Sequence, residues 1–144
     1  MPSDGRSLWE SITASGFPAG RLYGIAQRIP LADLANATSL GGRLEELRDE
    51  SVVLLAWDQL TAALALIELD GVARRMVLCP PDVKPEHLPA IMQDAEAGAC
   101  VIDQTGAFGS LSFPTVVRAG PELTERDLPR QRSRDTEWVL LTSG

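Results

Sequence analysis

The sequence predicts an α/β fold in three layers, with a mostly parallel sheet between two layers of helices. Short apolar runs recur along the chain, at residues 52–56, 76–79, 99–103, 115–117 and 138–142. They are apolar throughout rather than alternating, which is typical of strands that are covered on both faces. Helical patterns separate the first three runs, which favours right-handed βαβ crossovers and therefore a parallel sheet.

Both predicted crossover helices carry end signals. In residues 58–70, Asp58 is placed to cap the first turn, and Gly71 to take the left-handed position after the last turn. In residues 85–97, apolar side chains recur at the spacing of one helical face, and the helix is predicted to stop at Gly98. The residues of that face are Leu88, Ile91, Met92 and Ala95.

Length and composition predict one domain. The chain has 144 residues, of which 44% are hydrophobic and 23% charged, as in an ordinary globular domain. Residues 1–30, which are rich in Gly and Pro, are predicted to be irregular, and residues 31–144 to form an α/β subdomain. Short helical pieces are expected at 31–37 and 43–48, and a loop-rich excursion around one short strand between 106 and 135.

Charge and apolar runs exclude several function classes. With 13 Lys and Arg against 20 Asp and Glu, the net charge is 13 − 20 = −7, which disfavours nucleic-acid binding. No apolar run has the length of a signal peptide or a membrane span, so we expect a cytoplasmic chain. Cys79 and Cys100 lie in apolar segments without metal-ligand spacing, which predicts two reduced, buried thiols.

The last residues carry the clearest chemical signal. The segment 136–144 is an apolar run that leads directly into Thr142, Ser143 and Gly144. Glycine lets the backbone approach an anion closely, and hydroxyls and successive N–H groups can donate to phosphate oxygens. A turn is the structural alternative for the same three residues.

This ending resembles the ATP phosphate loop of the AMP-forming acyl-CoA synthetases and related adenylate-forming ligases. In that family, an Asp followed by an apolar strand leads to Thr-Ser-Gly-[Ser/Thr]-Thr-Gly-x-Pro-Lys, and this chain has Asp135-Thr-Glu-Trp-Val-Leu-Leu-Thr-Ser-Gly144. Softer matches precede it in the family's order, at 30–34, 69–81 and 86–103. Asp70 stands where the family usually has a lysine.

The resemblance implies that this chain is the N-terminal portion of a ligase whose large N-terminal domain begins with this α/β unit. Thr142, Ser143 and Gly144 would then bind the phosphates of ATP. The whole enzyme would use ATP and Mg²⁺ to convert a fatty or aryl carboxylic acid to an acyl-adenylate, and would pass the acyl group to a thiol such as CoA. The 144-residue piece alone is expected to be inactive, with no catalytic residue of its own.

Other interpretations stay open. Asp58 follows a predicted strand, as the phospho-acceptor of a receiver domain does, and Asp103-Gln-Thr-Gly106 resembles segments in which an aspartate is phosphorylated. The chain could therefore be a receiver-like or flavodoxin-like domain, or a non-catalytic α/β interaction module. Because an interrupted parallel sheet exposes unpaired edges, a homodimer or domain swap is also expected.

Overall fold

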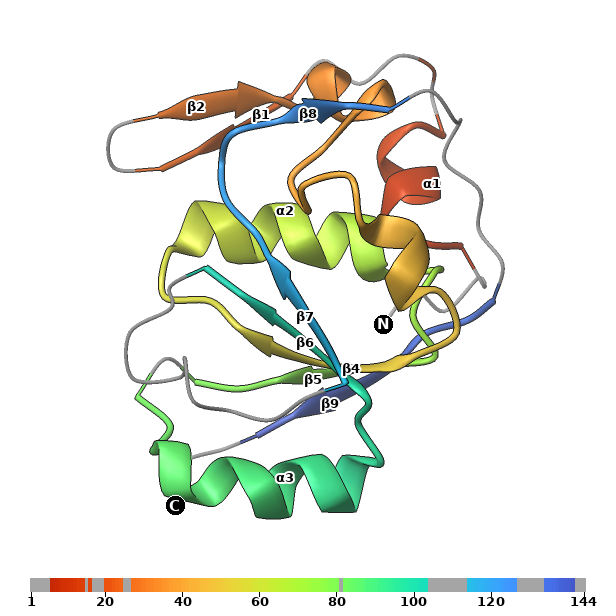
Figure 1. Cartoon of the computed structure of the whole chain (residues 1–144). Helices are drawn as coiled ribbons and strands as arrows, with labels where there is room; N and C mark the ends of the chain where they lie inside the picture. Colours follow the sequence, from red (N-terminus) through yellow and green to blue (C-terminus); the bar gives the residue numbers. More distant parts are fainter. Residues whose placement is uncertain are drawn as a thin grey trace.

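The computed structural model describes residues 6–14, 16, 20–24, 27–80, 82–103, 114–126 and 134–141. Five parallel strands form the central sheet in the order β7-β6-β4-β5-β9 (Figure 1). These strands are β4 (Ser51–Leu55), β5 (Arg75–Leu78), β6 (Ala99–Ile102), β7 (Thr115–Arg118) and β9 (Glu137–Leu140). All five apolar runs are therefore strands, and the prediction of a general α/β fold with a parallel sheet is confirmed.

Two helices cover opposite faces of this sheet (Figure 1). The first crossover forms α2 (Gln59–Leu69), and the second forms the 3-10 turn η3 (Pro85–His87) followed by α3 (Leu88–Ala95). The chain moves from β4 to β5 on one side and then back past β4 to β6 on the other. Crossovers of one hand that run in opposite directions must place their helices on opposite faces, which explains the layering.

Alternate residues of the strands divide the core between the two helices. One cluster, which includes Val52 and Leu54 of β4, packs against Ala65 and Leu69 of α2. The other includes Val53 of β4 and packs against α3. All five residues of β4 are buried, as the unbroken apolar pattern predicts for a central parallel strand.

A further layer lies outside α2 and corrects the prediction of three layers. It contains helix α1, two short antiparallel pairs and one 3-10 turn (Figure 1). These elements are α1 (Leu8–Ile12), β1 (Arg21–Tyr23), β2 (Arg28–Pro30), η1 (Leu31–Ala35), β3 (Ala37–Thr38) and β8 (Thr124–Glu125). The 3-10 turn η2 (Leu44–Leu47) instead packs Leu44 and Leu47 in the cluster between α2 and the sheet. Residues 1–30 therefore include regular structure, although they were expected to be irregular. Leu60, Leu64 and Ile67 face this layer and bury the outer side of α2.

The helix ends follow the sequence signals in one case and depart from them in the other. Asp58 accepts a hydrogen bond from the Thr61 N–H at 3.0 Å, and Gly71 has φ +93°, as predicted for α2. Helix α3, however, ends at Ala95, because Glu96 takes the left-handed conformation with φ 52°. The predicted stop at Gly98 is thus wrong.

Asp70 connects the outer layer to the sheet. Its carboxylate accepts the Leu8 N–H at 2.8 Å through Oδ2 and the Trp138 indole N–H at 2.7 Å through Oδ1. The residue is only 6% exposed, so both donors depend on this one group. A lysine, which has no acceptor, could not take this place.

We predict that Asp70→Asn destabilises the protein by about 1–3 kcal/mol, because an amide offers one oxygen and leaves one of the two donors without an acceptor. Urea denaturation followed by tryptophan fluorescence measures the loss. Asp82→Asn, at an exposed position, is the control and should leave the unfolding free energy unchanged. Equal stability of the two variants would contradict the role assigned to Asp70.

Candidate functional site

The strands of the central sheet run in one direction, so β4, β5, β6 and β9 end at the same side of the sheet. Ligands of open α/β sheets bind outside the carboxyl ends of the strands, at the point where neighbouring connections leave in opposite directions. Here that point lies between β4 and β6. The fold therefore defines a candidate site formed by the segments that follow these strands.

Asp103 lies at this switch point, directly after β6. Its Oδ2 accepts the N–H groups of Trp57 at 2.8 Å and of Asp58 at 2.7 Å, which ties the end of β6 to the start of α2. Its Oδ1 is buried without a hydrogen-bond partner. The sequence indicates that Asp103 lies at the end of a strand. Its backbone partners, Trp57 and Asp58, could be found only from the pairing of β4 with β6.

Asp58 is held as a helix cap. Its Oδ2 accepts the Thr61 N–H and also the Thr61 hydroxyl, at 2.8 Å. Both aspartates named in the receiver-like interpretation therefore serve as acceptors for α2 and its approach. The strand order also differs from the flavodoxin-like order, in which the fifth strand of the sheet along the chain lies beside the fourth. Here the fourth strand along the chain is β7 and the fifth is β9, but β9 lies beside β5.

The predicted phosphate-binding residues Thr142, Ser143 and Gly144 lie outside the described residues. The strand that leads to them is firmly anchored. The Thr136 hydroxyl accepts the Gly71 N–H at 2.7 Å and donates to the Ala73 carbonyl at 2.7 Å. The pairing with β5 continues past β9, since the Leu141 N–H donates to the Leu78 carbonyl at 3.2 Å.

Two of the hollows among the described residues bear on the search for a site. A groove of about 240 Å³ lies between α3 and the β5–β9 part of the sheet, with Ile91, Val77 and Val139 along its floor and Arg75 and Glu137 at its rim. Its volume is below the roughly 300–1,000 Å³ of typical small-molecule sites. The rim residues form an ion pair at 3.3 Å.

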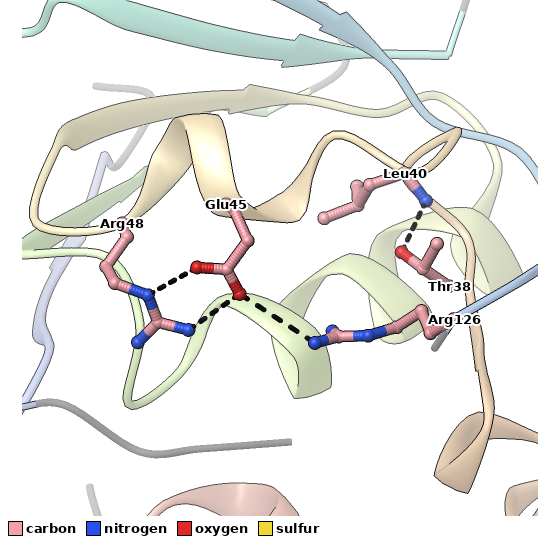
Figure 2. A network of polar contacts seen from close by, with 5 residues as sticks. All are labelled: Thr38, Leu40, Glu45, Arg48 and Arg126. Atoms are coloured by element: carbon pink, nitrogen blue, oxygen red, sulfur yellow. Dashed lines mark hydrogen bonds and ion pairs between the residues drawn. The ribbon is translucent and has the colours of Figure 1, made fainter. Parts of the chain in front are cut away.

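The second hollow, of about 40 Å³, is lined by Arg126, Glu68 and Asp70 among others. Figure 2 shows the polar contacts beside it, in which Glu45 accepts from Arg48 at 2.7 and 2.9 Å and faces Arg126 at 3.8 Å. The bond from Arg48, with Arg126 nearby, lowers the pKa of Glu45. This volume has room for about two or three water molecules, so it cannot take a substrate.

Within the described ranges, no group of three or more His, Cys, Asp or Glu side chains is arranged to hold a metal ion. Among the same residues, no helix has the length and apolar character needed to cross a membrane.

The two cysteines are buried and unpaired, as predicted. Burial raises the pKa of Cys79 to about 11, and burial together with the neighbouring Cys79 raises that of Cys100 to about 12. Thiolate is the reactive form, and at pH 8 almost none is present at either position. The thiols are therefore not candidates for chemistry.

We predict that both thiols react with Ellman's reagent at least about 100-fold more slowly in the native protein than in urea at pH 8, because burial keeps them protonated. Because folding raises both pKa values, the protonated thiols stabilise the native state. This contribution is fully present when the pH is below the ordinary pKa of a thiol. This contribution is lost as the pH rises from about 9 toward 11 and 12. Equal rates in the native and unfolded chains would contradict the assignment.

Comparisons of this chain with protein families, with curated proteins and with solved structures gave no match in any of the three.

Proposed function

We propose that this chain is the N-terminal portion of an ATP-dependent, AMP-forming ligase that activates a carboxylic acid. The resemblance of the segment Asp135–Gly144 to the family's phosphate loop carries the proposal. The position of β9 supports it. That strand is parallel to β5 and ends at Leu140, two residues before Thr142 in the sequence, and ligands of such folds bind at the carboxyl ends of the strands.

The donor types suit a phosphate group. Thr142 and Ser143 offer neutral hydroxyls, and Gly144 allows close approach of backbone N–H groups. The carboxylates of Asp58 and Asp103, which follow β4 and β6, accept backbone N–H groups, so part of their negative charge is offset by these bonds. Magnesium in such sites is usually held by phosphate oxygens with one or two carboxylates.

In the proposed reaction, a carboxylate oxygen of the substrate attacks the α-phosphorus of ATP, and the bond to the bridging oxygen of pyrophosphate breaks. Thr142, Ser143 and Gly144 would hold the β- and γ-phosphates in line for this displacement and stabilise the charge that develops on the leaving group. Transfer of the acyl group to a thiol such as CoA would follow. In the family that the chain resembles, the groups that select the acid and the thiol follow this loop in the sequence.

The first test is the coding sequence beyond the codon for Gly144. We predict that it continues with Ser or Thr, then Thr-Gly-x-Pro-Lys, in one reading frame. Any other continuation, or a stop codon, would overturn the proposal and favour a non-catalytic interaction module.

The second test is exchange of labelled pyrophosphate into ATP by the product of the whole gene. We expect exchange that depends on a carboxylic acid and falls by about 10- to 100-fold in Thr142→Ala or Ser143→Ala, since each removes a donor to a charged group. Thr124→Ala, at an exposed position in β8, is the control and should leave exchange unchanged. Full exchange in both loop variants would remove these residues from the site.

A further inference from the structure

Strand β9 forms one edge of the central sheet, and part of its backbone is unpaired. On the side that faces β5, the Glu137 N–H donates to the Arg74 carbonyl at 3.1 Å, and the Leu141 N–H donates to the Leu78 carbonyl at 3.2 Å. Alternate residues direct their backbone groups to opposite sides of a strand, so those of Trp138 and Leu140 point away from β5. Among the described residues, nothing pairs with this outward side of β9.

The side chains of β9 do not protect this edge. Native proteins usually block an exposed edge strand with a charge, a proline or a bulge. The charged residue of β9, Glu137, lies at its start and is paired with Arg75 of β5 at 3.3 Å, and residues 138–141 contain neither a charge nor a proline. Leu140 is 68% exposed, and by alternation it lies on the same face as Trp138, which packs against the core on the α2 side.

The opposite edge, strand β7, is protected. The N–H groups of Thr115 and of Ala119, which follows β7, point toward β6 and donate to carbonyls there. Because alternate residues point to opposite sides, the backbone groups of Val116 point away from β6. The outward carbonyl of Val116 accepts a hydrogen bond from the Arg43 guanidinium at 2.7 Å. Arg118 places an exposed charge on the same edge. In the part of the chain that the structure describes, one edge of this sheet is thus blocked and the other is left open.

We propose that β9 pairs with the β9 strand of a second copy of this chain, so that the sheets of two copies become continuous. The blocked β7 edge is what selects this occupant. A head-to-tail contact between β9 and β7 would build an open-ended filament, and Arg43 prevents it. Pairing of β9 with itself about a two-fold axis uses only the open edge and closes after two copies.

The two-fold axis makes the two β9 strands antiparallel, and the register centred on Val139 is the one that gives the outward groups of both Trp138 and Leu140 partners within β9. The outward groups of Trp138 face those of Leu140 in the second copy, and each such pair exchanges both N–H···O bonds. The exposed Leu140 side chain then lies beside Trp138 of the second copy, where its apolar surface is removed from water. Val139 of each copy meets its own equivalent at the axis.

Sedimentation velocity of the 144-residue chain at micromolar concentration tests the proposal. We expect a dimer for the parent chain and for Val116→Lys, which adds the same charge to the blocked edge. Leu140→Lys should sediment as a monomer, with the dissociation constant raised by about 100-fold or more. A monomeric parent chain, or a dimer equally stable in Leu140→Lys, would overturn the proposal.

Amide hydrogen exchange of the unmodified chain, read by NMR, provides a test that needs no variant. Exchange at Trp138 and Leu140 should slow as the concentration rises, whereas exchange at Val116 and Arg118 should not change. Fast exchange at Trp138 and Leu140 in a dimer would place the interface elsewhere. Slow exchange at both in a monomer would show that a segment of the same polypeptide covers this edge. Either result would overturn pairing with a second copy.

Discussion

Burial of the parallel sheet on both faces is the constraint on which the other layers depend. Strand β4 has neighbours on both sides and no exposed residue, so apolar side chains project from both of its faces. Each face needs a cover, and a parallel connection supplies a helix as it returns to the other end of the sheet. The cover α2 is itself apolar on its outer side, and a further layer of short elements packs there. The order of the layers thus follows from the amino-acid composition of one strand and of the helix beside it.

Local patterns could predict the sheet but not the outer layer. Unbroken apolar runs and the end signals of α2, with Asp58 before it and Gly71 after it, are visible in the sequence because each depends on a few neighbouring residues. The β1–β2 pair has only three residues in each strand, too few for a recognisable alternating pattern in the sequence, and its Leu22 and Ile29 pack on the outer side of α2. The order of the strands and the partners of Asp103 depend on contacts between residues far apart in the chain. For the candidate site, the sequence indicated that Asp58 and Asp103 follow strands. The binding of phosphate by Thr142, Ser143 and Gly144 remains a prediction.

Three acids, Glu68, Asp70 and Asp103, act as hydrogen-bond acceptors for groups that lie far away in the sequence. Glu68, which is 2% exposed, accepts the N–H and the hydroxyl of Ser39, while Asp70 and Asp103 each accept donors from other elements. A charged acceptor makes a stronger bond than a neutral one and fixes the position of the segment that donates to it. These acids join the layers to one another.

The carboxylate of Asp70 has a consequence for how the chain folds during synthesis. Its two donors, Leu8 and Trp138, lie near opposite ends of the sequence. On the ribosome, the contact with Leu8 can form as soon as α2 has emerged, whereas the oxygen that faces the indole stays without its donor until residue 138 has been made. The arrival of β9 is therefore the step that completes the outer layer as well as the sheet, and a nascent chain halted before Trp138 would hold its first helix less firmly.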